Sequence, residues 1–133
     1  MSAPDRAALV QAAWQARENA YAPYSQFRVG AAVLAGSGKI YPGTNVENAS
    51  SGLTICAERA AIFAAIGAGE RSIRAVAVVT EAEQPTPPCG ACRQVLQEFG
   101  PEALVVAANR TGRSREWRLS DLLPDAFGPE SVG

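Results

Sequence analysis

Residues 73–108 read IRAVAVVTEAEQPTPPCGACRQVLQEFGPEALVVAA, and most of the fold can be predicted from them. The two ends, 73–79 and 103–108, are short and almost continuously apolar, which is typical of strands buried on both faces of a sheet. Between them lie a proline-rich loop and a helical segment, 89–99, which Gly100-Pro101 ends. A buried strand, a helix and a second buried strand form one unit of an α/β sheet.

The residues before this stretch are predicted to add a helix, a hairpin and a second helix. Segment 5–20 carries apolar side chains at helical spacing, and Asp5 can cap its start. Segments 28–34 and 39–46 flank a Gly-Ser-Gly turn, which favours an antiparallel pair. Segment 54–68 is helical, with glycines marking its end.

After the stretch, segment 117–123 is predicted to form a short strand and then one helical turn that Ser120 caps. The resulting order is helix, hairpin, helix, strand, helix, strand. Alternating buried strands and helices predict an α/β fold in which helices cover both faces of the sheet. The hairpin makes that sheet mixed rather than purely parallel. The 133 residues contain no long linker or repeat and suit one domain, 1–133.

Composition excludes several classes of protein. Apolar residues make up 47% and charged residues 19%, which is typical of globular chains. The formal net charge is −1, so there is no basic surface field of the kind that nucleic-acid binders use. No apolar run approaches the roughly 20 residues of a membrane span, and the start has no signal-peptide pattern. We therefore expect a cytoplasmic protein.

Two counts narrow the chemistry. The chain has no histidine, which excludes Ser-His-Asp triads, Cys-His proteases and any metal site that includes histidine. It has three cysteines, and an odd number without an export signal argues against a disulfide framework. All three lie in two short segments, CAER at 56–59 and PCGAC at 88–92, and each segment is at the predicted start of a helix.

These positions favour a metal site. Free N–H groups and the positive end of the helix dipole at each helix start stabilise a thiolate. Cys56, Cys89 and Cys92 can together hold one Zn²⁺, and three ligands leave the fourth tetrahedral position open for water. An open position is typical of catalytic zinc. We therefore expect one zinc ion per chain.

Glu58 and Arg59 are the predicted partners of this metal. Because a helix cap is not yet helical, Glu58 can turn in beside the open position, where a carboxylate can take a proton from water and deliver it to a substrate nitrogen. Three thiolates make zinc a poor Lewis acid unless cations offset their charge, and Arg59 can donate hydrogen bonds to a thiolate. The anionic cluster is expected to raise the pKa of Glu58.

Each motif also has a simpler interpretation. Cys89 and Cys92 alone could be a redox pair, all three cysteines could be core residues, and Glu58 and Arg59 alone would be an ordinary surface ion pair. A zinc module in which the metal only holds the fold is a further alternative. The combination of Cys-x-Glu with Pro-Cys-x-x-Cys is far more specific than its parts, because it is the signature of zinc-dependent nucleoside and nucleobase deaminases.

The chain resembles the small, homotetrameric type of cytidine deaminase over most of its length, from about Tyr24 to Glu130. The segments that carry the resemblance occur in the family's order: YSQFRVGAA at 24–32, GTNVENAS at 43–50, CAERAA at 56–61, PCGACRQV at 88–95 and LLPDAFGPE at 122–130. The resemblance implies a three-layer α/β/α fold with a five-stranded mixed sheet. It also implies a homotetramer whose active sites are shared between subunits.

The resemblance assigns roles to further residues. Asn45 and Glu47 match the pair that binds the ribose 3′-hydroxyl, where an amide and a carboxylate can clamp one hydroxyl group. Phe27 matches an aromatic residue that packs on the pyrimidine ring, and the backbone near Ala57 matches a segment that contacts the base edge. Phe127 matches an aromatic side chain that enters the site of a neighbouring subunit.

One departure from the family pattern is Ser51, where an aromatic residue that helps to form the wall of the nucleoside site is common. The activity implied is hydrolysis of cytidine and 2′-deoxycytidine to uridine and 2′-deoxyuridine with release of ammonia, a step of pyrimidine salvage. The alternative is a related deaminase that acts on a free base or on a cytosine-containing antibiotic such as blasticidin S. An enzyme that edits nucleic acid fits less well, because the chain lacks a basic groove.

Overall fold

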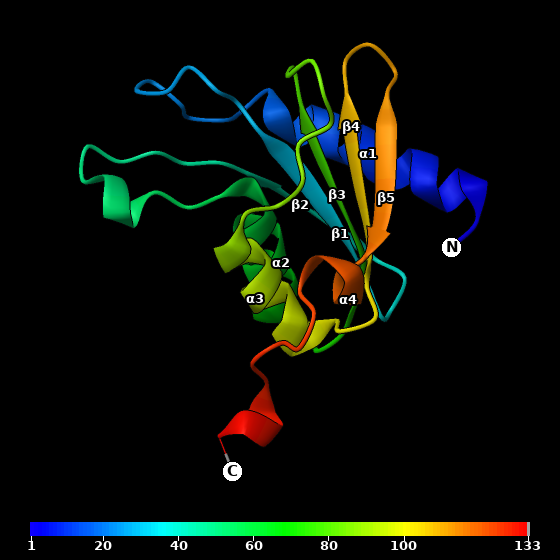
Figure 1. Cartoon of the computed structure of the whole chain (residues 1–133). Helices are drawn as coiled ribbons and strands as arrows, with labels where there is room; N and C mark the ends of the chain where they lie inside the picture. The colour runs from blue at the N-terminus through cyan, green and yellow to red at the C-terminus, as the bar shows by residue number, and fades with distance from the viewer. Residues whose placement is uncertain (133) are drawn as a thin grey trace.

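Five strands form one mixed sheet in the order β2-β1-β3-β4-β5 in the computed structural model, which describes residues 1–132. Helix α1 covers one face of this sheet, and α2 and α3 cover the other (Figure 1). The elements are α1 (Ala3–Arg17), β1 (Gly30–Ala35), β2 (Ile40–Thr44), η1 (Ser51–Leu53), α2 (Ala57–Gly67), β3 (Ile73–Thr80), α3 (Gly90–Phe99), β4 (Leu104–Asn109), β5 (Ser114–Arg118), α4 (Leu119–Leu122) and η2 (Pro129–Ser131). The expected three-layer α/β/α fold is confirmed.

Strand pairing brings separate loops together at one end of the sheet. β1 runs antiparallel to both β2 and β3, whereas β3 and β4 are parallel, as the strand-helix-strand stretch predicts. Gly30 at the start of β1 lies opposite Val79 near the end of β3. The segment that enters β1 and the loop that leaves β3 are therefore neighbours, and the candidate site lies between them.

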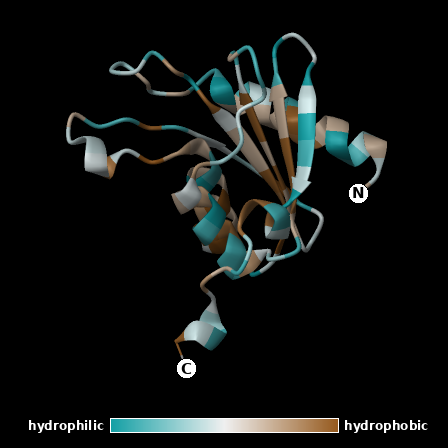
Figure 2. Ribbon diagram, viewed as in Figure 1, coloured by the Kyte–Doolittle hydropathy of each residue, from teal (hydrophilic) through white to brown (hydrophobic). Residues whose placement is uncertain are grey.

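The core consists of two apolar clusters, one on each face of the sheet. Ile62 of α2 and Leu96 of α3 belong to one cluster, and Leu9 and Ala13 of α1 belong to the other. Strands β1, β3 and β4 between them are mainly apolar, whereas the edge strand β5 is mainly hydrophilic, as Figure 2 shows. β1 and β3 bury nearly every residue because both of their faces are covered, which explains their continuous apolar runs.

Helix α1 differs from the sequence-based expectation at both ends. Its N-cap is Ser2 rather than Asp5: the Ser2 hydroxyl accepts from Asp5 N at 3.2 Å, and the Asp5 carboxylate accepts from Ser2 N at 3.4 Å. Asp5 is thus the third helical residue of a capping box. The α-helix ends at Arg17 because residues 18–20 tighten into a turn, in which Asn19 N and Ala20 N bond to carbonyls three residues back.

The C-terminal region contains the fifth strand. The predicted short strand at 117–123 begins earlier, as β5, and the helical turn is α4. The expected cap Ser120 is wrong, since Arg118 occupies the N-cap position without a side-chain bond. β5 is an edge strand whose side chains are mostly exposed, so it has no apolar pattern by which it could be recognised.

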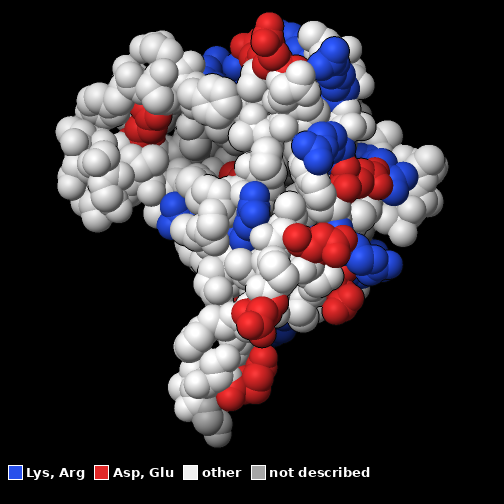
Figure 3. Space-filling model, in the orientation of Figure 1, with Lys and Arg blue, Asp and Glu red and all other residues white. Residues whose placement is uncertain are grey.

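Every helix among residues 1–132 is too short or too polar to cross a bilayer. On the face drawn in Figure 3, basic and acidic side chains are interspersed, and no continuous basic stripe is visible. This distribution agrees with the nearly balanced charge of the chain.

Candidate active site

The three cysteines lie at the starts of two neighbouring helices. Cys56 is the N-cap of α2 and Cys89 is the N-cap of α3, while Cys92 lies in the first turn of α3. Close packing fixes the first of these helix starts, because a side chain added at Gly43 of β2 would meet Ala57 O at 2.6 Å. α2 therefore rests directly on the backbone of β2. The expected placement of the thiols at helix N-termini is confirmed.

The three sulfur atoms form a compact cluster with the spacing of a metal site. All three lie within 4.8 Å of one another, with 3.8 Å between the Sγ atoms of Cys56 and Cys89 and 3.5 Å between those of Cys89 and Cys92. Sulfur ligands at about 2.3 Å from a tetrahedral zinc would be about 3.8 Å apart. The donor set and its spacing thus fit a zinc ion, and three thiolates leave one position for another ligand.

Arg59 supplies positive charge to this cluster. Its Nη2 donates to Cys56 Sγ at 3.5 Å from one turn further along α2. Hydrogen bonds from the neighbouring Cys92 thiol and from Arg59 lower the pKa of Cys56 to about 5. The same interaction with Cys56, together with burial, raises the pKa of Cys92. The site therefore stabilises a thiolate at Cys56 first, which is the form that binds a metal.

Glu58 is a buried carboxyl group beside the thiols. Its side chain lies in the first turn of α2 and only 6% of the residue is exposed. The pKa of Glu58 is raised to about 7, chiefly by burial and also by the nearby Cys56 thiolate, against the opposing effects of a backbone hydrogen bond and of Arg59. The sequence predicted a raised pKa from the anionic cluster, but desolvation is the larger cause. A carboxyl group with such a pKa can both hold and release a proton at neutral pH.

A cavity of about 270 Å³ opens in front of these groups. Its lining includes Cys56, Ala57, Glu58 and Cys89, together with Phe27. Cys92 is buried behind this surface. Asn45 and Glu47 also line the cavity. The cavity is therefore lined by predicted site residues from four separate segments of the chain.

Asn45 fixes the backbone of the segment that carries Phe27. Its Oδ1 accepts from Val29 N at 3.0 Å, and its Nδ2 donates to Phe27 O at 2.9 Å. Asn45 is 7% exposed, so this amide is largely inside the fold. One N–H and one lone pair of the amide remain for a ligand, because a primary amide has two donors and two acceptor positions.

Glu47 is held in place by the segment before Phe27. One carboxylate oxygen accepts from Tyr24 N at 2.9 Å and from Ser25 N at 3.1 Å, and the other accepts from the Ser25 hydroxyl. These bonds, led by the one from the Ser25 hydroxyl, keep the pKa of Glu47 below its ordinary value. Ser25 Oγ in turn accepts from Phe27 N at 3.0 Å. The ionised carboxylate and the aromatic ring are thereby fixed relative to each other.

Two residues singled out in the sequence lie outside this cavity. Phe127 is 61% exposed on the C-terminal tail, and its carbonyl accepts from Gln94 Nε2 at 3.0 Å. Ser51 is exposed in η1, on a segment that extends away from the sheet (Figure 1). Neither residue lines the cavity of its own chain.

The sequence did not identify every residue that lines the cavity. Thr80 at the end of β3 and Thr86 and Pro87 in the following loop also line it. Thr80 Oγ1 and Thr86 Oγ1 are 3.3 Å apart, which ties the loop to the strand. The prolines at 85–88 indicated a rigid loop, but threonines carry no signal that distinguishes a lining residue from an ordinary surface residue.

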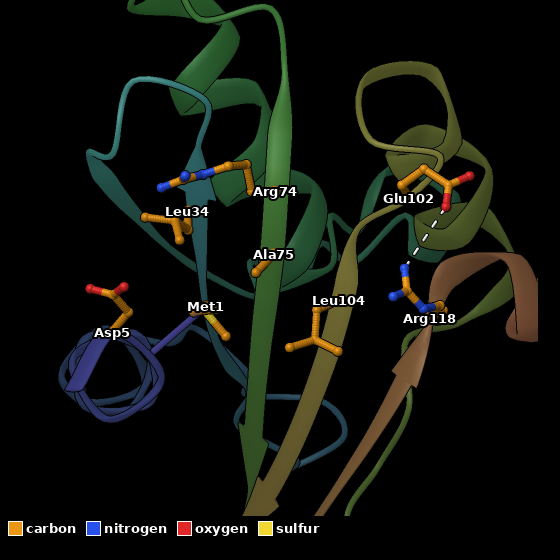
Figure 4. A pocket seen from close by; sticks show the side chains of 8 residues that line it. All are labelled: Met1, Asp5, Leu34, Arg74, Ala75, Glu102, Leu104 and Arg118. Atoms are coloured by element: carbon orange, nitrogen blue, oxygen red, sulfur yellow. Dashed lines mark ion pairs between the residues drawn. The ribbon is translucent and has the colours of Figure 1, made fainter. Parts of the chain in front are cut away.

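A second cavity, of about 310 Å³, lies on the α1 side of the sheet (Figure 4). Asp5, Arg74, Glu102 and Arg118 surround a floor that includes Leu104. Charges of both signs line it, and Arg118 and Glu102 are 3.9 Å apart. None of the three thiols lines this cavity, and the buried Glu58 carboxyl group does not line it either.

Comparison with known families gives a match that contains both cysteine segments. Residues 4–108 match the family model described as "Cytidine and deoxycytidylate deaminase zinc-binding region". That span is well over half of the chain and includes the three cysteines and Glu58.

Individual relatives agree with this match. A curated cytidine deaminase from Halalkalibacterium halodurans is 50% identical over 129 residues, covering 96% of this chain and 98% of the relative. One from Mycobacterium tuberculosis is 48% identical, covering 90% and 87%. The crystal structure of a cytidine deaminase from Burkholderia pseudomallei superposes with a TM-score of 0.89 at 53% identity, covering 96% of this chain and all of that chain.

Proposed function

The chain belongs to the cytidine and deoxycytidylate deaminase family, and from this premise we propose that it hydrolyses cytidine and 2′-deoxycytidine to uridine and 2′-deoxyuridine. Water supplies the oxygen at C4 of the pyrimidine, and the exocyclic amine leaves as ammonia. The observation that carries the proposal is the buried Glu58 carboxyl group, which lies beside three clustered thiols and lines a cavity of about 270 Å³. We propose, as the family resemblance implies, that this reaction is a step of pyrimidine salvage.

Cys56, Cys89 and Cys92 are the proposed zinc ligands. When bound, the metal supplies a Lewis acid that lowers the pKa of water at the open coordination position. Arg59 offsets part of the negative charge of the three thiolates through its bond to Cys56 Sγ. The N-termini of α2 and α3 act in the same direction, since their dipoles favour negative charge at the cap positions.

Glu58 is the proposed catalytic acid and base. Its carboxylate takes one proton from the attacking water and delivers it to N3 of the pyrimidine. It then takes the proton of the new C4 hydroxyl group and delivers it to the departing amine, so that the C4 carbonyl forms as the C–N bond breaks and ammonia leaves. Both protonation states are needed in one cycle, and the raised pKa of Glu58, about 7, makes both accessible near neutral pH. Burial among apolar groups also keeps bulk water from competing for these proton transfers.

The remaining cavity residues orient the nucleoside. Phe27 offers its ring to the base, and the backbone at Ala57 offers polar groups to the base edge. Asn45 and Glu47 bind the ribose hydroxyl, as donor and acceptor respectively. Glu47 suits this role because its own hydrogen bonds hold it ionised and in a fixed position before substrate arrives.

Ammonia release from cytidine, cytosine and blasticidin S, measured side by side, tests the substrate class. A nucleoside enzyme is expected to favour cytidine strongly, because only a nucleoside uses both the base pocket and the Asn45–Glu47 pair. Faster turnover of blasticidin S or of the free base would assign the chain to another deaminase activity. A folded, zinc-loaded chain that releases no ammonia from any of the three would favour a purely structural role for the metal.

Replacing Glu47 with glutamine tests the ribose contact. We expect kcat/KM for cytidine to fall roughly 10- to 100-fold, the effect of losing a hydrogen bond to a charged group. Activity on free cytosine, which has no ribose, should not fall with it. Ser25→Ala is an informative comparison, since it leaves the charge of Glu47 but removes the bonds of the Ser25 hydroxyl to Glu47 and to Phe27 N. Equal losses on cytidine and cytosine would contradict the assignment.

We also propose that the active form is a homotetramer in which subunits share sites. Tyr24, Leu53 and Phe127 are more than 60% exposed, on three segments that extend away from the sheet in Figure 1. Apolar side chains on such projecting segments suit contact with a second copy of the chain. Sedimentation should give a mass of four chains, and Phe127→Ala should lower kcat/KM roughly tenfold without changing zinc content. A fully active monomer would contradict this proposal.

A further inference from the structure

Arg17 is a buried arginine outside the cavity. It is the last residue of α1 and is only 8% exposed. Its Nε donates to Arg28 O at 3.1 Å, and its Nη2 donates to Glu81 Oε2 at 2.6 Å. The guanidinium also lies 5.9 Å from the centre of the Trp14 ring. One planar group thus has three partners, on α1 and on two different loops.

The two segments that Arg17 joins both contribute residues to the lining of the candidate active site. Arg28 follows Phe27 directly in the segment that enters β1. Glu81 begins the loop that leaves β3 and runs through the lining residues Thr86 and Pro87 to Cys89. The two segments are neighbours because β1 and β3 pair, and Arg17 bridges them at the point where they leave the sheet.

The backbone around Phe27 is held from two sides. On one side, Asn45 bonds Phe27 O and Val29 N. On the other side, Arg17 bonds the carbonyl of the intervening residue, Arg28. The position of Arg17 is itself fixed, since a side chain at Gly30 would meet Arg17 Cβ at 2.7 Å, and α1 and β1 are therefore in direct contact.

We propose that Arg17 is a positioning residue for substrate binding: by bonding Arg28 O and Glu81 at once, it fixes the segment that carries Phe27 relative to the loop after β3, and both of these line the cavity. The role rests on the proposed function, because Phe27 is taken to contact the pyrimidine. Arginine suits it better than lysine, since a planar fork donates in two fixed directions, whereas an ammonium group is a compact point charge.

Arg17→Met and Arg17→Lys test the proposal in the zinc-loaded enzyme. We expect Arg17→Met to raise KM for cytidine and the Kd for uridine by about 10- to 100-fold, the range for a small misplacement of a binding group. Zinc content should be unchanged and kcat should fall much less than KM rises. Arg17→Lys keeps the buried positive charge, so it provides the same test if Arg17→Met does not fold. We expect it to show most of the same increase in KM for cytidine and in Kd for uridine.

The matched control is Arg6→Met. Arg6 lies on the same helix and pairs with Glu116, but it does not contact either loop of the site. Its KM should equal that of the wild type. A purely structural role for Arg17 would lower the melting temperature of both arginine variants while leaving KM and the uridine Kd unchanged, which would overturn the proposal.

A double-mutant cycle with Phe27→Ala tests the route of the effect. If Arg17 acts through the Phe27 ring, Arg17→Met should add little to the loss in uridine affinity once the ring is absent. Fully additive losses would refute that route. Uridine binding does not require turnover, so this result is independent of the deaminase assay. Absence of ammonia release by the wild-type enzyme would refute the proposed function rather than the role of Arg17.

Discussion

Glu58→Gln is expected to reduce turnover of cytidine by about 10⁴-fold, the upper end of the range for general acid–base catalysis, because Glu58 is assigned several proton transfers in one cycle. Glutamine has nearly the same shape as the glutamate it replaces but cannot exchange a proton. The Glu58 side chain is buried, and its ionisation is opposed by desolvation. An uncharged amide should therefore be accommodated without loss of the fold.

The informative comparison is between activity and metal content in this variant. Zinc per chain and thermal unfolding should match the wild type, since Glu58 is not one of the three clustered ligands. Glu70→Gln is a suitable control, because Glu70 is a carboxylate that bonds Ser37 and Tyr41 away from the cavity. Undiminished ammonia release by Glu58→Gln would refute its role as the proton carrier.

Cys89→Ala is the second change with a large expected effect. Cys89 is exposed, so its loss leaves no cavity in the core, and the chain should still fold. Removing one of three thiolates should reduce zinc affinity by more than the roughly 10- to 100-fold typical of residues that only orient a ligand. Deaminase activity should disappear together with the metal, and metal analysis of the purified variant checks this.

Cys92→Ala separates loss of the metal from loss of packing. Cys92 is 1% exposed, so its replacement should cost about 1 kcal/mol of folding free energy in addition to the bound metal. We therefore expect both variants to lack zinc, with Cys92→Ala melting at the lower temperature. A Cys89→Ala variant that retains one zinc per chain and full activity would contradict the assignment of the three-sulfur site.

The sequence predicted those strands whose burial is visible as a run of apolar residues. β3 and β4 are apolar along nearly their whole length because helices cover both faces of the sheet. β5 carries SREWR and lies at an edge, so neither alternation nor an apolar run marks it. The α1 cap was misplaced because Ser2 and Asp5 are both good caps, and only the geometry shows that they act together.

The candidate site was predictable where a residue type by itself restricts the chemistry. The chain has three cysteines near helix starts and no histidine, so a three-thiolate metal site was the interpretation that the sequence favoured. The three sulfur atoms do lie within 4.8 Å of one another. Arg17 shows the opposite case. An arginine in the last turn of a helix is ordinarily a solvated residue that favours the helix dipole. Its burial depends on Arg28 and Glu81, which the sheet brings to it from distant positions in the sequence.

Titration of the metal-depleted chain with zinc, with ammonia release from cytidine as the signal, tests whether the three-sulfur site holds the catalytic metal. We expect activity to rise linearly and to reach a plateau at one zinc per chain, because Cys56, Cys89 and Cys92 form a single site. Activity that is independent of added zinc, or metal that binds at this stoichiometry without any ammonia release, would contradict it.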